Sequence, residues 1–339
     1  MPFSFVPFLN IETDFFILSA LALVIFAQMV LGVVLPRRAN GAPFMVWAAQ
    51  TVLRTLSHKL NRTGRTRGSL IVRGVMAYVF LALVAWSITR LAVIISYTVP
   101  YGWVLTLVLV WGCFGVRQLW QNLRLVTAAP TLSALKKRKA DIAKITGMVD
   151  PKNDPHTLAR GVIMYAGYAI LKHVVAPAVV FSVFGLLGLM FYVLLCTAPV
   201  PVDMGRLRKT PYFGLFHITH SLVDFIPARI TGLFIVIAGV LTPTASPLKS
   251  LQALYSADQP FPSMVFGHVA KAMAGGCNTS LGGAVTYRDD LAIAPQLYPW
   301  VGPKKASAMA DMVTLKRAFG LVIMVTLLCF ILSLLALTL

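Results

Sequence analysis

Long uninterrupted apolar runs are the feature that most restricts what this chain can fold into. Residues 15–35 form a run of 21 residues without a charged side chain, and residues 319–339 close the chain with another run of the same length. A helix needs about 20 apolar residues to cross the hydrocarbon core of a bilayer. Only 12% of the chain is charged, whereas soluble domains carry about 25%. The sequence therefore predicts an integral membrane protein and excludes a water-soluble domain.

The apolar runs together predict an all-α, polytopic fold of five or six transmembrane helices in one membrane domain, residues 1–339. The spans are expected near residues 15–35, 74–96, 103–116, 174–196, 230–241 and 319–339. Apolar residues recur at helical spacing over residues 44–60, which predicts an amphipathic helix on the inner membrane surface.

Two stretches do not read as simple spans. Residues 161–202 are too long for one straight span, so we expect a buried or re-entrant helix to about Ile170, followed by the span at 174–196. The region 243–318 is mixed in polarity and contains one clear helix, for which Ser263 is the expected N-cap.

The distribution of charge predicts the orientation of the chain. There are 30 Lys and Arg residues against 11 acidic ones, and the basic residues gather in two loops, 36–73 and 117–160. Cytoplasmic loops of membrane proteins are rich in Lys and Arg and contact anionic lipids. Acidic residues precede the first apolar run and arginines follow it: Glu12, Asp14, Arg37 and Arg38. We therefore expect a periplasmic N-terminus, and, because no nucleic-acid-binding motif is present, no nucleic-acid partner.

Lys172 and His173 lie in the middle of about forty apolar residues. Charged groups at membrane depth are costly and are usually functional or paired. A helix N-terminus at Val174 would add positive potential, and the two side chains would then hold a phosphate or a carboxylate. The alternative is that Lys172 extends to the membrane interface and has no ligand.

His217, His220 and Asp224 are spaced three and four residues apart, so they share one helix face. Such a face is a candidate for binding a divalent metal, or for a hydrogen-bonded row beside an aqueous cavity. Arg229 follows Asp224 by five residues, which is compatible with a local ion pair or with an anion clamp.

A polar, glycine-rich segment, residues 278–283, follows the helix that begins at Ser263. Its backbone N–H groups, with Asn278, Gly282 and Gly283, would be able to cradle a phosphate. The alternative is a helix C-cap followed by a turn.

Several of these motifs together resemble one family. Residues 224–231, Asp-Phe-Ile-Pro-Ala-Arg-Ile-Thr, resemble the N-x-x-P-A-R-L-T signature of the CobD/CbiB family, the integral-membrane adenosylcobinamide-phosphate synthases. Residues 272–275, 281–283 and Tyr287 are similar to its A-M-A-G-x-L…L-G-G…Y segment. Residues 160–177 align with the stretch that ends E-N-x-x-D-G-x-x-x-P in the family. The resemblance covers most of the chain.

The resemblance implies a protein of the bacterial inner membrane that forms an amide between adenosylcobyric acid and aminopropanol or its phosphate, a step of cobalamin biosynthesis. It implies ATP and Mg²⁺ as cofactors and a corrinoid or other small anionic ligand as partner. The oligomeric state is left open, and a homo-oligomer is one of the alternatives. The catalytic residues would be Lys172, Asp203 and Asp224, with Asp203 and Asp224 also binding the metal. The substrate-binding residues would be Arg160, His173, His217, His220, Arg229, Asn278, Gly282, Gly283 and Tyr287.

The chain departs from the family where the family carries acids. Asp224 stands at the Asn of the signature. Family acids are lost at four positions, Met164, Tyr168, Lys172 and His220. Because Mg²⁺ prefers carboxylate oxygens, these losses predict altered or lost catalysis; in an active enzyme, Lys172 would neutralise phosphate charge instead. The alternative function is a catalytically degenerate, AmpE-like membrane sensor, scaffold or ligand-binding protein. A transporter is a third class, but the sequence shows no internal repeat to support it.

Overall fold

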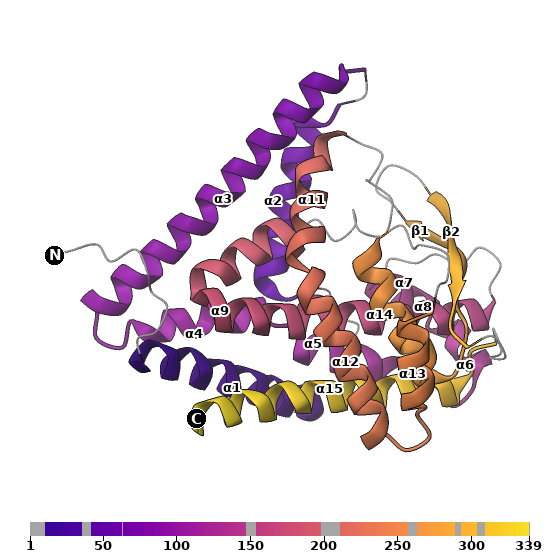
Figure 1. The fold of residues 1–339 in the computed structure, drawn as a ribbon. Coiled ribbons are helices and arrows are strands. Elements are labelled where there is room, and N and C mark those ends of the chain that lie inside the picture. Colours follow the sequence, from indigo (N-terminus) through magenta and orange to yellow (C-terminus); the bar gives the residue numbers. More distant parts are fainter. Residues whose placement is uncertain are drawn as a thin grey trace.

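The structure is a computed structural model that describes residues 11–35, 42–62, 64–146, 154–197, 211–256, 263–288, 293–303 and 309–338. These residues form a bundle of helices with a two-stranded sheet along one side (Figure 1). The first half comprises α1 (Ile11–Val34), α2 (Phe44–Leu60), α3 (Arg67–Thr98), α4 (Trp103–Cys113), α5 (Val116–Thr127), α6 (Leu132–Lys137), α7 (Lys139–Thr146) and α8 (Pro155–Ile170). The second half comprises η1 (Leu171–Val175), α9 (Ala176–Phe191), η2 (Tyr192–Thr197), η3 (Pro211–Phe213), α11 (Gly214–Val223), α12 (Phe225–Leu241), α13 (Pro247–Leu254), α14 (Met264–Cys277), β1 (Leu281–Arg288), β2 (Ile293–Val301) and α15 (Met312–Thr338).

Four helical stretches of the described residues are long and apolar enough to cross a membrane: Arg67–Thr98, Trp103–Thr127, Pro155–Cys196 and Met312–Ala336. The pair Pro211–Val223 and Phe225–Leu241, bent by 48°, is a fifth candidate. The apolar part of α1, Leu18–Val34, is shorter and packs along α15 (Figure 1). The helical, multi-pass membrane fold predicted from the sequence is confirmed.

The span expected at 103–116 continues further than predicted, because α4 is followed directly by α5. The sequence predicts a basic loop from residue 117, but one face of α5 is buried against α1, α8 and α15. Gln28 of α1 stabilises the break between the two helices. Its amide donates to the carbonyls of Trp111 (2.8 Å) and Phe114 (3.1 Å), and its oxygen accepts from the N–H of Arg117 (3.3 Å).

The stretch Pro155–Cys196 is one helical path with three irregularities. Residues Leu171–Val175 form a π turn, in which the N–H of Ala176 donates to the carbonyl of Leu171, and a second π turn begins at Tyr192. Gly185 breaks the regular geometry with φ 62° and ψ −156°, a conformation that glycine adopts at least cost. The prediction of a helix N-terminus at Val174 is therefore wrong, because the backbone stays helical through Lys172 and His173.

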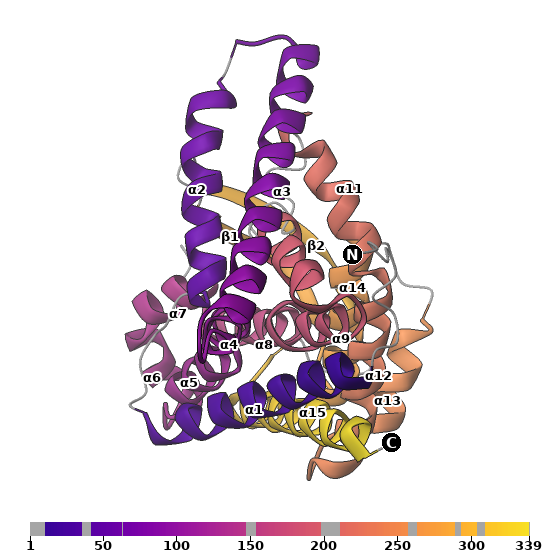
Figure 2. The ribbon, with the colours of Figure 1, turned by 90° about the vertical axis from the view of Figure 1, so that its left-hand side faces the viewer.

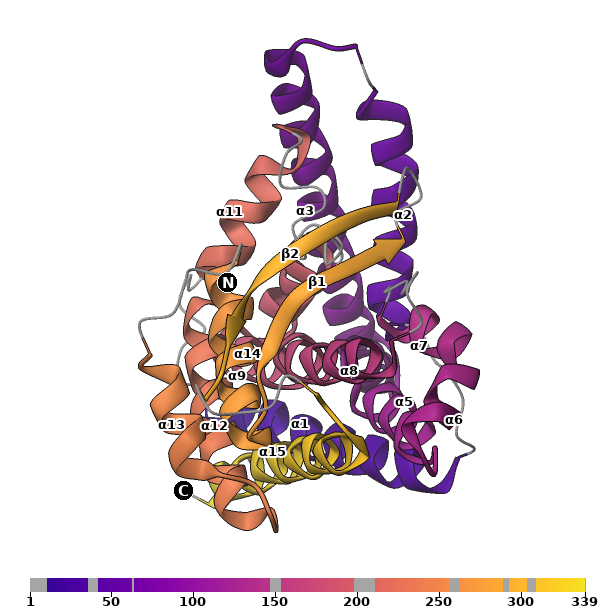
Figure 3. The ribbon, with the colours of Figure 1, turned by 90° about the vertical axis from the view of Figure 1, so that its right-hand side faces the viewer.

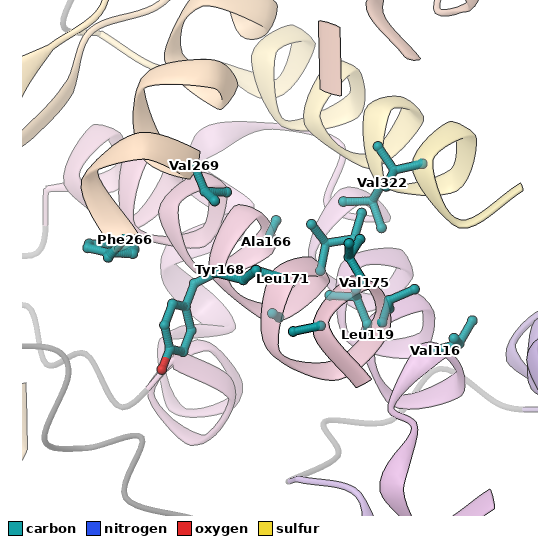
Figure 4. Packing of buried hydrophobic residues seen from close by; sticks show 14 of the residues in the cluster. Val116, Leu119, Ala166, Tyr168, Leu171, Val175, Phe266, Val269 and Val322 are labelled. Atoms are coloured by element: carbon teal, nitrogen blue, oxygen red, sulfur yellow. The ribbon is translucent and has the colours of Figure 1, made fainter. Parts of the chain in front are cut away.

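The first π turn lies at the centre of the apolar core. Figure 4 shows Leu171 and Val175 among side chains from α5, α8, α14 and α15, and both residues are fully buried. Lys172, which directly follows Leu171, is thereby carried into the interior of the bundle.

α2 and α3 form an antiparallel pair that projects from the rest of the bundle (Figure 2). The bounds of α2 match the predicted amphipathic helix, and its place on the membrane surface stays a prediction. α3 buries a row of mostly small residues and exposes large apolar ones along its length. The buried row consists of Gly74, Ala77, Leu81, Ala85, Thr89 and Ala92.

α14 begins where the sequence predicts, with the Ser263 hydroxyl accepting from the N–H of Phe266. It is followed by an antiparallel hairpin, β1–β2, in which Leu281 pairs with Val301 and Arg288 with Ile293. The hairpin crosses the side of the molecule formed by α8 and α14 (Figure 3). It is an addition to the all-α prediction, since the mixed polarity of region 243–318 did not indicate strands.

The close contact between α3 and η3 yields a test of the fold. A methyl group on Gly74 would overlap the backbone carbonyl of Tyr212, whereas one on Gly68, in the same helix, would meet nothing within 4 Å. We expect G74A to destabilise the protein by about 1–3 kcal/mol and to lower its thermal unfolding temperature in detergent. G68A should leave that temperature unchanged or raise it, and equal effects of the two variants would contradict the packing described.

Candidate functional site

Three of the residues singled out in the sequence meet in the core. Lys172 of η1 forms an ion pair with Asp224, its Nζ lies 2.6 Å from Nδ1 of His220, and it donates to the carbonyl of Cys196 at 3.0 Å. His220 Nδ1 is also 2.6 Å from Asp224 Oδ2. The side chains of Lys172 and Asp224 are fully buried, and His220 is only 1% exposed. We call these three residues the Lys172 cluster.

The cluster forms where three irregular points of the backbone come together. Lys172 lies in the π turn η1, and Cys196 lies in the π turn η2. Asp224 lies at the bend between α11 and α12. Its backbone N–H donates to the carbonyl of His220, and its carbonyl accepts from the backbone N–H of Ala228. π turns are frequent at functional sites because they redirect a side chain or a carbonyl. This convergence makes the cluster the strongest candidate site among the described residues.

Two tyrosines that the sequence analysis did not include in the site flank the lysine. Nζ of Lys172 lies 6.0 Å from the ring centroid of Tyr168 and 5.7 Å from that of Tyr192. Aromatic faces stabilise a nearby ammonium group, more strongly where water is excluded. The signal for Tyr168 was its spacing, four residues before Lys172, which places it one turn away on the same helix face.

The geometry determines what the cluster can do chemically. An ammonium group and an imidazole occupy the positions around the Asp224 carboxylate where a divalent cation would bind. Within the described ranges, no group of three or more His, Cys, Asp or Glu side chains is placed to hold a metal ion. The described residues therefore do not fit a magnesium site, and His217, His220 and Asp224 do not form one. Asp203, the second predicted metal ligand, lies outside the described residues.

Arg160 of α8 and His173 of η1 make contacts outside the Lys172 cluster. Arg160 is near the start of α8, where Nη2 donates to the Thr157 hydroxyl at 2.8 Å and the guanidinium lies 5.2 Å from the Trp300 ring. His173 packs against Gly115 in the break between α4 and α5, and its carbonyl accepts from the N–H of Gly115 at 3.0 Å.

His217 of α11 is partly buried beside His220, with ring centroids 6.5 Å apart.

Arg229 does not form the local ion pair that was one interpretation of its position. It is exposed on α12, where it donates to the carbonyl of Phe225 at 2.8 Å and covers the Phe225 ring. Asp224 is instead engaged by Lys172 and His220, because the bend turns its side chain into the core.

The glycine-rich segment is a helix cap that leads into the hairpin. Asn278 adopts the left-handed backbone conformation, and the N–H groups of Asn278 and Thr279 donate to carbonyls of α14. Gly282 and Gly283 have positive φ at the irregular start of β1, and the backbone of Tyr287 pairs with Ala294. The N–H groups that a phosphate would need at Asn278 and Thr279 are thus already used, which favours the C-cap interpretation.

Comparison with known proteins gives one result that spans nearly the whole chain. The sequence model of a family described as CobD/CbiB protein matches residues 21–322. No curated protein and no solved structure matches the chain.

The burial of the Lys172 cluster predicts how its members respond to substitution. Removing one partner of a buried ion pair leaves an uncompensated charge and costs about 3–5 kcal/mol, whereas replacing both by apolar residues is often neutral. We expect K172M to reduce the yield and unfolding temperature of the folded protein, and K172M/D224L to recover most of the loss. A control, K249M on exposed Lys249, should have little effect. A double variant as unstable as the single one would contradict this pairing.

The N-cap of α8 predicts a pH dependence. Burial alone would raise the pKa of Asp154, but hydrogen bonds from Thr157 and the N–H of His156, together with the charge of Arg160, lower the pKa below its ordinary value of 3.8. A lowered pKa stabilises the folded state above the ordinary value, and this stabilisation is lost as the pH falls through the folded-state pKa. We expect D154A to lower the unfolding temperature at pH 7 and to approach wild type once the pH has fallen below the lowered pKa of Asp154.

D154N is the matched control for this cap, because Asn also caps helices well but does not titrate. Its unfolding temperature should stay near wild type at pH 7. A D154A deficit that persists unchanged to low pH would contradict the assignment.

Proposed function

The chain belongs to the CobD/CbiB family of cobalamin-biosynthesis membrane proteins, and from this premise we propose that it is a non-catalytic member that binds a ligand rather than converting it. The observation that carries the proposal is the closed Lys172 cluster. The two described residues expected to be catalytic, Lys172 and Asp224, neutralise each other in the core. A cluster that is closed and buried in this way presents no reactive group to a substrate.

Catalysis by Lys172 would require the ion pair to open. The ammonium group would then leave Asp224, His220 and the carbonyl of Cys196 together, in a region from which water is excluded. Separating a buried pair costs several kcal/mol, because each charge loses its partner without regaining water. This cost would add directly to the barrier of any reaction that used the lysine.

The resemblance to the family supports the same proposal. It places an acid at position 172 and an asparagine at position 224, whereas this chain has Lys172 and Asp224. The two replacements are complementary in charge, and the structure brings them into contact. We infer that an internal ion pair has taken the place of carboxylates that would otherwise bind a metal.

The ligand we propose is a corrinoid or another small anionic molecule. Basic side chains from the predicted binding set remain at least partly accessible: Arg160 is half-buried beside Trp300, and Arg229 is exposed on α12. Guanidinium groups bind carboxylates and phosphates through paired hydrogen bonds. An alternative form of this proposal is a scaffold or AmpE-like sensor role, in which the ligand regulates a partner.

The second candidate is the amide-forming activity itself, with ATP and Mg²⁺. The observation in its favour is that the chain retains the Pro-Ala-Arg motif of the family signature. Its arginine, Arg229, is exposed at the surface of α12. In this case the carboxylates for Mg²⁺ would have to include residues outside the described ranges, Asp203 among them.

One assay separates the two candidates. Detergent-solubilised protein is incubated with adenosylcobyric acid, aminopropanol phosphate, ATP and Mg²⁺, and corrinoid binding and amide product are followed together. We expect saturable corrinoid binding and no product above a heat-denatured control. Product formation would contradict the non-catalytic proposal and favour the ligase, and the absence of both binding and product would contradict both candidates.

A further variant tests the role of the cluster in either outcome. K172M/D224L removes both charges while preserving an apolar core. A binding protein should retain corrinoid affinity within about threefold, whereas an enzyme that uses either group should lose at least 100-fold in turnover.

A further inference from the structure

Two arginines of the α5–α7 region are turned inward. Arg124 of α5 donates to the carbonyls of Gly32 (2.7 Å) and Val33 at the end of α1, and Arg138 donates to the carbonyl of Leu125 near the end of α5. These carbonyls have no partners within their own helices, so the arginines act as C-terminal caps.

Three of the four lysines in α6 and α7 are turned outward, and the fourth, Lys139, is half-buried. Lys136, Lys137 and Lys144 are exposed on α6 and α7, whereas Leu135 and Ile142 on the opposite faces are fully buried. The two short helices are therefore amphipathic, and their exposed side carries a row of ammonium groups.

The position of α6 and α7 places this row at the end of several candidate spans. Both helices pack on α8, whose span begins at Pro155, and Arg124 connects the adjoining α5 to the end of α1. In two views at right angles to Figure 1, α6 and α7 lie at the edge of the bundle beside α5 (Figures 2 and 3). Lysines at the ends of membrane spans are placed where they meet lipid headgroups.

We propose that Lys136, Lys137 and Lys144 form a docking surface for the anionic phospholipids of the inner leaflet. Juxtamembrane lysines are attracted to anionic headgroups, and an amphipathic helix holds them at the interface. Arg124 and Arg138 are occupied by backbone carbonyls and do not contribute. The surface is separate from the Lys172 cluster, so the proposal does not depend on whether the protein binds or converts a corrinoid.

The β1–β2 hairpin is connected to the same end of the α8 span. Trp300 of β2 lies over Arg160 near the start of α8, and Nδ1 of His156 lies 2.9 Å from the carbonyl of Ala310, just before α15. The hairpin and the start of α15 are therefore at the same end of the α8 span as the lysines. A headgroup contact at the inner leaflet puts this end on the cytoplasmic side.

The first test measures lipid selectivity. Detergent-solubilised protein is titrated with phosphatidylglycerol or phosphatidylcholine. The lipids that stay bound after removal of the detergent are counted by native mass spectrometry. We expect wild type to prefer phosphatidylglycerol, K136Q/K137Q/K144Q to lose that preference roughly 10-fold or more, and K136R/K137R/K144R to keep it. An unchanged preference in the glutamine variant, or its loss in the arginine variant, would overturn the proposal.

The second test determines the side of the membrane. The four cysteines of the chain are buried, so K137C introduces an exposed thiol. A membrane-impermeant maleimide should label K137C in inverted vesicles and leave it unlabelled in right-side-out spheroplasts. Labelling from the outside would contradict an inner-leaflet surface whatever the lipid selectivity.

Discussion

A lysine ammonium in an apolar core has to be neutralised where it lies, and the centre of this bundle is organised around that requirement. Lys172 is fully buried, so an opposite charge must reach it through the packing. Asp224 does so because the path from α11 to α12 bends at that residue, and His220 lies one turn earlier on the same side. The bend, the π turn at Lys172 and the carbonyl of Cys196 are parts of one arrangement.

The irregular helix segments are compatible with a membrane because other groups satisfy their backbone. In hydrocarbon, unpaired N–H and C=O groups are costly, so breaks are tolerated only where they are buried in protein. Gln28 supplies the missing hydrogen bonds at the break between α4 and α5. The carbonyl exposed by the second π turn is used by Lys172. Polar side chains in this bundle therefore form hydrogen bonds with backbone groups as well as with each other.

The charge of the Lys172 cluster is balanced within the protein. An acid at position 172 would add negative charge next to Asp224 and would call for a bound cation, whereas Lys172 supplies the positive charge covalently. The core then needs no metal in order to be neutral. In the non-catalytic member that we propose, an internal ammonium group would take the place of a metal and no Lewis acid would be present.

Much of the helical framework could be predicted from local patterns in the sequence. The runs at 15–35 and 319–339, the amphipathic helix at 44–60 and the start of α14 at Ser263 are each signalled by nearby residues. The hairpin and the inward side of α5 could not be predicted in this way. Gln121 and Asn122 read as loop residues in the sequence, yet both are buried, because α1, α8 and α15 provide the surface that α5 covers.

The sequence by itself determined that the chain is a multi-pass membrane protein, because apolar length and charge content depend on composition alone. It also determined which polar residues lie at membrane depth. Only the tertiary structure decided which of them meet: Lys172 contacts His220, 48 residues away, whereas Arg229, five residues from Asp224, does not pair with it. Helical periodicity assigns a side chain to a face of its own helix. Its partner depends on how separate helices pack, and that depends on the whole core.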